Sequence, residues 1–215
     1  MKKIKTAKGR KTSSTLWIER QLNDPYVMKA QKEGYRSRAA YKLREMNEKH
    51  QFLKPHMAVV DLGAAPGGRC QVALQKKCAK IVAIDLLDMD ELPGVDFFQQ
   101  DFMADEAPSL LRAKLEGPAD VVLSDMAHNT TGHKYTDHLK IMALVEAAYD
   151  FATEILKPGG SFLAKTFQGG ADSELLARMK IEFTQVKHLK PPASRADSSE
   201  RYVLATGFRP LKSVN

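Results

Sequence analysis

The stretch from Val59 to Cys70, "VVDLGAAPGGRC", decides how the rest of the chain is interpreted. A short apolar run ends in the acidic residue Asp61 and passes directly into glycine, alanine and proline. This pattern is typical of a buried strand that feeds a loop lying against a ligand, because glycine lets the backbone approach closely. The stretch therefore predicts a strand, a ligand-binding loop and a helix that begins near Arg69.

Similar apolar runs recur after Pro55, and most are too apolar to leave one face of a strand in water. The seven candidate strands cover residues 57–63, 79–87, 95–101, 119–126, 159–167, 183–190 and 201–208. Helical periodicity lies between them, at 68–77, 106–115, 137–156 and 172–181. This alternation predicts an α/β fold with a parallel sheet covered by helices. Because no helix joins the last two strands, they are expected to form an antiparallel hairpin at one edge.

The segments outside this domain differ in composition. Residues 1–15 are basic and poor in large apolar side chains, which predicts a disordered arm. Residues 16–55 are expected to form a helical lead-in, with an amphipathic helix over 37–49 whose N-cap is Ser37. Residues 56–210 then form one α/β domain, and 211–215 form a short tail.

Composition narrows the class of protein. The chain has 215 residues and a formal net charge of +7, which favours a polyanionic partner such as RNA or DNA. No apolar segment approaches the roughly 20 residues that span a bilayer, and no apolar signal core follows the basic N-terminus. Cys70 and Cys78 lack CxxC spacing, so neither a zinc site nor a disulfide framework is indicated. We therefore expect a cytoplasmic protein that does not bind membranes.

The glycine loop and the strand ends indicate which ligand binds. The loop from Gly63 to Gly68 matches neither the dinucleotide pattern GxGxxG nor the phosphate-loop pattern GxxxxGK[ST]. The second strand ends in Asp85 and the third in Asp101. Such acids suit ribose hydroxyls and an amine, and would repel a pyrophosphate. Each feature alone is common in proteins without a ligand, but their order at successive strand ends predicts a nucleoside that carries no phosphate.

Seven segments carry a resemblance to a known family: "SRAAYKL", "VVDLGAAPGG", "AIDLL", "DFFQQDF", "LSDMAHNTTGHKYTDH", "GGSFLAKTFQG" and "SSERYVLATGF". Over about residues 34 to 210 the chain resembles the RrmJ/FtsJ family of S-adenosylmethionine-dependent RNA ribose 2′-O-methyltransferases, and most of all its bacterial ribosomal branch. The resemblance implies a Rossmann-like sheet of seven strands, mostly parallel with the last strand antiparallel, and helices on both faces. It also implies that residues 56–210 form a methyltransferase domain and that S-adenosylmethionine is the cofactor. The implied substrate is a uridine of 23S rRNA in the large ribosomal subunit.

The resemblance also implies individual site residues. The Lys-Asp-Lys-Glu tetrad of the family falls on Lys42, Asp125, Lys165 and Glu200, which are the expected catalytic residues. The expected cofactor contacts are Gly63, Gly67, Arg69, Asp85, Asp101 and Asp125. Two positions depart from the family pattern: Arg69 stands where tryptophan is common, and His128 stands where proline is usual. The histidines around this position do not have the spacing of a metal site, so no metal is expected.

Methyl transfer to a ribose hydroxyl requires in-line placement of the reacting atoms and a base, because the hydroxyl is a weak nucleophile. Lys165 follows three apolar residues at the end of the fifth strand, where a lysine is unusual. Burial and neighbouring cations would lower its pKa and make it a base. Asp125 is expected to orient Lys165, while Lys42 and Glu200 complete a cluster of alternating charge.

RNA is the expected partner, since only RNA carries the 2′-hydroxyl. The basic residues expected to follow its backbone are Lys32, Arg36, Arg38, Lys42, Arg195 and Arg201, with additional reach from Lys2 to Lys11. We expect the enzyme to act as a monomer. Two alternatives stay open at this point: a 2′-O-methyltransferase that acts on tRNA or an mRNA cap, and a non-catalytic ribosome-assembly factor that binds RNA.

Overall fold

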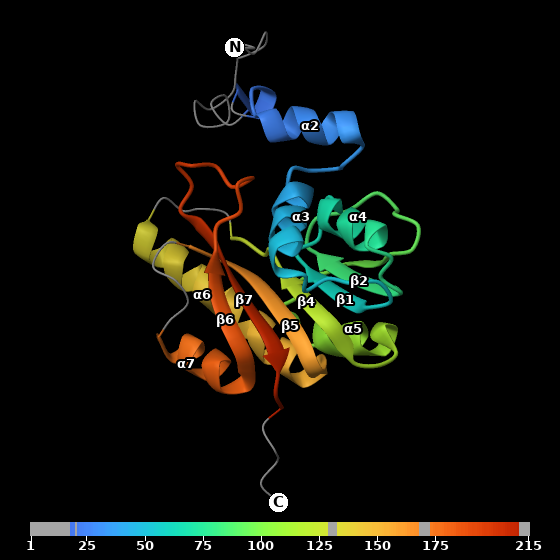
Figure 1. Ribbon diagram of the computed structural model, residues 1–215, viewed down its shortest axis with the longest axis vertical. Helices are drawn as coiled ribbons and strands as arrows, with labels where there is room; N and C mark the ends of the chain where they lie inside the picture. Colours follow the sequence, from blue (N-terminus) through green and yellow to red (C-terminus); the bar gives the residue numbers. More distant parts are fainter. Residues whose placement is uncertain (1–17, 20, 129–132, 168–172, 211–215) are drawn as a thin grey trace, which may run out of the picture.

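The computed structural model describes residues 18–19, 21–128, 133–167 and 173–210. The predicted basic arm, 1–15, and the predicted tail, 211–215, lie outside the described residues. Six labelled helices accompany a sheet in the part that is described (Figure 1). They are α2 (Pro25–Glu33), α3 (Ala39–His50), α4 (Gly68–Gln75), α5 (Ala107–Leu115), α6 (Lys134–Ile155) and α7 (Ser173–Glu182).

The sheet has seven strands in the order β3-β2-β1-β4-β5-β7-β6. Their bounds are β1 (Ala58–Leu62), β2 (Lys80–Asp85), β3 (Asp96–Gln99), β4 (Ala119–Ser124), β5 (Leu156–Phe167), β6 (Phe183–Leu189) and β7 (Glu200–Phe208). Strands β1 to β5 pair in parallel, and β7 runs antiparallel to both β5 and β6. The predicted parallel sheet, the antiparallel last strand and the hairpin at one edge are confirmed, and the topology is Rossmann-like.

Helices cover both faces of the sheet, as predicted (Figure 1). Val59 of β1 belongs to the core under α2, α3 and α4, whereas Val60 belongs to the core under α5, α6 and α7. Successive side chains of a strand point to opposite faces, so a strand covered on both sides must be apolar at nearly every position. This double burial explains why the predicted strands are continuous apolar runs.

The prediction that Ser37 caps helix α3 is wrong. The helix begins at Ala39, its N-cap position is Arg38, and no side chain there bonds to the helix. The Ser37 hydroxyl makes no hydrogen bond and is buried. It packs against Gly68 at the start of α4, so closely that a Cβ on Gly68 would collide with it. Packing between two helices therefore takes precedence over the local capping preference of serine.

Asn47, in the last turn of α3, fixes this helix to the segment that leads into β1. Its buried amide donates to the Leu53 carbonyl at 3.0 Å and accepts from the Leu53 backbone N–H at 2.7 Å. A buried amide that satisfies its partners in this way costs free energy when it is removed, because the partner groups stay buried without bonds. Asn47 thus holds the helix that carries Lys42.

We predict that Asn47→Ala lowers the free energy of unfolding by about 2 kcal/mol, because two buried backbone groups of Leu53 lose their partner. Urea denaturation measures the difference. Glu48→Ala is the matched control, since Glu48 lies on the same turn and its side chain is 61% exposed beside Arg44. Equal stability of the two variants would show that Asn47 does not anchor the helix.

Candidate active site

The predicted site residues come together at the carboxyl edge of the parallel strands. Asp85 is the last residue of β2, Asp125 directly follows β4, and Lys165 lies two residues before the end of β5. The sequence order of the strands reverses between β1 and β4, and ligands of open parallel sheets bind beside such a reversal. The edge that carries these side chains is therefore the candidate active site.

The glycine loop after β1 is shaped by close packing against the protein itself. Gly63 and Gly67 have φ angles of 74° and 100°, a conformation that favours glycine. A Cβ on Gly63 would lie 2.9 Å from the backbone nitrogen of Met126, and one on Gly67 would lie 2.7 Å from Met89 Sδ. Both glycines thus let the loop lie flat against the segments that follow β4 and β2.

The strand-end acids hold the turns around the same edge. Asp85 accepts from the backbone N–H of Ala65 and from that of Leu87, each at 2.9 Å. Asp101 is exposed beyond β3 and accepts from the backbone N–H of Met103 at 2.9 Å. Carboxylate oxygens here suit ribose hydroxyls and an exocyclic amine, so the donor and acceptor chemistry of this edge fits a nucleoside without phosphates.

Sequence reasoning missed three apolar side chains beside these acids. Leu86, Leu87 and Met103 are 65%, 69% and 51% exposed, although each follows closely after a strand-end aspartate. Exposed large apolar groups next to strand-end acids suit the flat face of a nucleobase. The available signal was the sequence "DLL" and "DFM", in which apolar residues continue past the point where the strand should end.

Lys165 and Asp125 are in direct contact. The Lys165 Nζ donates to the Asp125 backbone carbonyl at 2.7 Å and lies 3.2 Å from Asp125 Oδ1. The Tyr202 hydroxyl donates to the same Oδ1 at 3.0 Å. Tyr202 is the β7 residue that pairs in register with Lys165, so the two strands deliver both donors to one carboxylate.

Lys42 and Glu200 form the second ion pair of the cluster. The Lys42 Nζ lies 2.6 Å and 2.7 Å from the two Glu200 carboxylate oxygens, and each side chain is only 14% exposed. The Ser194 hydroxyl also donates to Glu200, at 2.9 Å. Lys42 comes from α3 and Glu200 is the first residue of β7, as predicted from the sequence.

Burial changes the protonation of these groups. Burial lowers the pKa of Lys165 to about 8, an effect that Glu200 and Asp85 oppose and the Arg69 guanidinium reinforces. Burial also lowers the pKa of Lys42, against the attraction of Glu200. Burial alone would raise the pKa of Glu200, but the ammonium groups of Lys42 and Lys165 hold it below its usual value. Lys165 therefore carries a proton that it can release near neutral pH.

Arg69 enters the cluster through its side chain, which the sequence did not predict. Its guanidinium lies 2.8 Å from Asp125 Oδ2 and 2.6 Å from Asp61 Oδ1, and donates to the Gly63 carbonyl at 2.6 Å. The Asp61 side chain is 1% exposed and also accepts from the Cys70 thiol at 3.3 Å. Arg69 thus bridges the carboxylates of β1 and β4.

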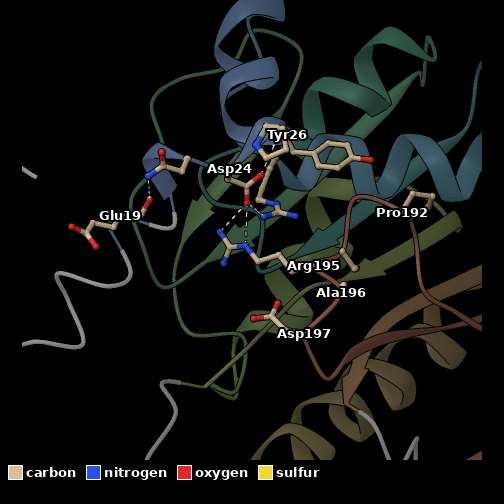
Figure 2. A pocket seen from close by; sticks show the side chains of 11 residues that line it. Glu19, Asp24, Tyr26, Pro192, Arg195, Ala196 and Asp197 are labelled. Carbon is tan, nitrogen blue, oxygen red and sulfur yellow. Dashed lines mark hydrogen bonds and ion pairs between the residues drawn. The ribbon is translucent and has the colours of Figure 1, made fainter. Parts of the chain in front are cut away.

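Two cavities are lined by both Arg38 and Arg195, and one of them reaches the Lys42–Glu200 pair. A cavity of about 580 Å³ opens between the start of α2, the start of α3 and the loop from β6 to β7 (Figure 2). Asp24, which lines this cavity, forms ion pairs with Arg38 and, at 2.9 Å, with Arg195. A second cavity of about 350 Å³ shares both arginines and reaches Lys42 and Glu200. Arg38 and Arg195, two of the predicted basic residues, therefore line both cavities.

Arg36, one of the basic residues predicted to follow the RNA backbone, binds carbonyl groups of the protein itself. Its guanidinium donates to the backbone carbonyls of Asp90 at 2.6 Å and Glu91 at 2.7 Å. These bonds tie the segment before α3 to the connection between β2 and β3. Within the described ranges, no group of three or more His, Cys, Asp or Glu side chains is placed to hold a metal ion, and no helix is long and apolar enough to span a bilayer.

The chain is similar to known methyltransferases in sequence and in structure. The model of the FtsJ-like methyltransferase family matches residues 35–208. A ribosomal RNA large subunit methyltransferase E from Bradyrhizobium sp. strain BTAi1 is 63% identical over 96% of this chain and 91% of its own. Its counterpart from Afipia carboxidovorans is 61% identical over 96% of this chain and 94% of its own. A solved Plasmodium falciparum structure, named as a ribosomal RNA methyltransferase, has a TM-score of 0.72 and 31% identity over 82% of this chain and 100% of its own.

The pKa of Lys165 has a measurable effect on stability. Because its pKa is about 8 in the folded chain and about 10.4 in an unfolded one, the unfolded state binds more protons between these values, and stability rises with pH there. Relative to Lys165→Met, the wild-type free energy of unfolding should rise by about 2 to 3 kcal/mol between pH 7 and pH 10.5.

Urea denaturation at a series of pH values checks this, with Lys180→Met as control for an exposed lysine on α7. A difference between wild type and Lys165→Met that stays constant with pH would contradict the lowered pKa.

Proposed function

Because the chain belongs to the FtsJ-like methyltransferase family, we propose that it transfers a methyl group to the 2′-hydroxyl of a uridine ribose in 23S ribosomal RNA. Relatives more than 60% identical over most of the chain, which are named for methylation of large-subunit ribosomal RNA, support this substrate. The observation that carries the chemistry is the buried Lys165, bound to Asp125 at the carboxyl edge of the sheet. A buried lysine of lowered pKa suits a base.

FtsJ-like methyltransferases use S-adenosylmethionine, which supplies a methyl group on a positively charged sulfonium. The loop at Gly63 and Gly67, with the backbone of Arg69, would lie against its nucleoside and amino acid parts. Asp85 and Asp101 would accept from its hydroxyls and amine. The acids around the edge suit a cationic ligand, and Asp125 would face its positive charge.

Lys165 acts as the general base in this proposal. With a pKa of about 8, roughly a quarter of the Lys165 amines are neutral at pH 7.5, so a base is present without a large energetic cost. The neutral Nζ accepts the proton of the ribose hydroxyl as the oxygen attacks. Asp125 holds Nζ through its backbone carbonyl and its carboxylate, and so fixes the direction of the accepting lone pair.

Lys42 and Glu200 complete the site as a tight ion pair. Glu200 favours the protonated form of Lys165, and its ion pair with Lys42 limits that attraction. Being partly exposed at the second cavity, the pair also lies where a ribose would enter. We assign it to positioning the target nucleotide by hydrogen bonds to the sugar.

The approach to the site suits an RNA backbone. Arg38 and Arg195 share the single carboxylate of Asp24, so these groups carry a net positive charge. Guanidinium groups of this kind bind phosphates. Lys32 and Arg201 are further candidates for such contacts, and the basic arm would extend them. We further propose that the enzyme works as a monomer in the cytoplasm, on RNA within the large ribosomal subunit.

Labelled S-adenosylmethionine tests the substrate. The protein is incubated separately with large ribosomal subunits, protein-free large-subunit RNA and tRNA, each isolated from cells that lack this gene, and the labelled nucleotide is then mapped. Label on one uridine of large-subunit RNA is expected. Label in tRNA alone would overturn the proposed substrate, and RNA binding without label in any sample would favour a non-catalytic assembly factor.

Substitution of Lys165 tests the base. Lys165→Ala should reduce the single-turnover rate by at least about 100-fold while S-adenosylmethionine affinity is largely kept, because the nucleoside contacts lie on other strands. Lys165→Arg should fail as well, since a guanidinium stays protonated. The wild-type rate should rise with pH through a midpoint near 8. Rapid-quench assays and calorimetry measure these quantities, and near-normal methylation by the arginine variant would exclude Lys165 as proton acceptor.

A further inference from the structure

The Asp125 carboxylate contacts three side chains, two of which are cations. Its Oδ2 lies 2.8 Å from the Arg69 guanidinium, while its Oδ1 is shared by the Tyr202 hydroxyl at 3.0 Å and the Lys165 Nζ at 3.2 Å. The shorter ion pair is with Arg69, and the longer one is with the proposed base. The negative charge of Asp125 is thus divided between two cations, and Lys165 has only part of it.

Several short contacts hold the Arg69 guanidinium in place beside Asp125. Its side chain is 7% exposed, and besides Asp125 it contacts the Asp61 carboxylate at 2.6 Å and the Gly63 carbonyl at 2.6 Å. Asp61 is itself buried in β1, directly before the glycine loop. The guanidinium therefore cannot swing away without leaving a buried carboxylate unpaired, which is strongly unfavourable.

We propose that Arg69 is a positioning residue for methyl transfer, which fixes the Asp125 carboxylate and prevents it from fully compensating the charge of Lys165. This inference rests on the proposed function of Lys165 as the proton acceptor. Without the guanidinium, both oxygens of Asp125 would be available to the lysine, and the ammonium form would be favoured. Arg69 keeps the amine ready to lose its proton, while Asp125 still directs it.

The other charged and titratable groups around Lys165 act in both directions. Glu200 of β7 and Asp85 of β2 favour its protonated form, whereas burial and Arg69 of α4 oppose it. Lys42 of α3 faces the same cluster, and the charges of the two lysines repel each other. Asp125 and Tyr202 also face the amine, and burial raises the pKa of Tyr202 well above its usual value. Removal of Arg69 deletes one of the cations that oppose protonation.

Two measurements on the full-length protein test the inference. The first is the titration of the Lys165 amine by NMR in protein labelled with ¹⁵N-lysine, where the Lys165→Arg spectrum assigns the signal. The second is the single-turnover methylation rate between pH 6 and pH 10. Arg69→Gln should move both midpoints to higher pH, and should lower the rate at pH 7 by about three- to tenfold, with a loss that narrows as the pH rises.

Three further variants make the result specific. Arg69→Lys keeps a cation near Asp125 and should leave the midpoints closer to those of wild type. Arg178→Gln removes an exposed arginine that pairs with Asp150 at 2.6 Å on the far helices, and should change neither measurement. If Arg69→Gln does not fold because Asp61 is left unpaired, Arg69→Gln with Asp61→Asn removes both charges, and the upward shift should persist.

The outcomes separate this inference from the proposed function. An Arg69→Gln rate that falls by the same factor at every pH, with an unchanged Lys165 titration, would overturn Arg69 as a positioning residue and leave it only a packing group. A Lys165 titration that shifts as expected, combined with a wild-type rate that does not follow that titration, would instead overturn Lys165 as the proton acceptor and keep Arg69 as the group that controls its charge.

Discussion

The Asp125 carboxylate is the contact on which the rest of the site depends. Its two oxygens lie 2.8 to 3.2 Å from the guanidinium of Arg69, the hydroxyl of Tyr202 and the ammonium of Lys165. The Asp125 backbone carbonyl also accepts a hydrogen bond from Lys165. Buried charges are tolerated only when each has close partners of opposite sign. Three buried or half-buried cations, Arg69, Lys42 and Lys165, are balanced here by three carboxylates, Asp61, Asp125 and Glu200. The elements that carry them are therefore locked together at one edge.

The parallel direction of the strands brings these residues to one edge of the sheet. Parallel strands end on the same side of the sheet, so the residues that finish β1, β2, β4 and β5 meet there. The antiparallel strand β7 adds its first residue, Glu200, at the same level, because its N-terminal end lies beside the carboxyl end of β5. Lys42 reaches this edge from α3, whose position is fixed by Asn47 on one side and by packing of Ser37 against α4 on the other. A helix outside the sheet thus completes a cluster that strands alone could not form.

The balance of charge also determines how the cluster can work. A lysine that is strongly paired with one carboxylate would stay protonated. A buried lysine without a carboxylate partner would lose its charge and its orientation. Lys165 lies between these limits, because Asp125 is shared with Arg69, Glu200 is shared with Lys42, and burial opposes the attraction of the acids. Direction and basicity are in this way supplied by different neighbours: Asp125 aims the amine, while burial and the surrounding cations set its protonation. The same balance makes the site sensitive to substitutions that do not touch Lys165.

The sequence by itself determined the α/β alternation, the antiparallel last strand, the glycine loop and the strand ends at which Asp85, Asp125 and Lys165 lie. These features leave local patterns in the sequence, since apolar runs, helix periodicity and glycine turns can be recognised from residues near one another in the chain. The tertiary structure alone decided the partners. Ser37 packs under α4 instead of capping α3, Arg36 binds backbone carbonyls, and Arg69 bridges Asp61 and Asp125. Such pairings depend on strand register and helix placement, which bring together residues up to 171 positions apart, as in Asp24 and Arg195. No local pattern encodes which of several cations a buried carboxylate will meet, because that choice is made by the packing of the whole domain.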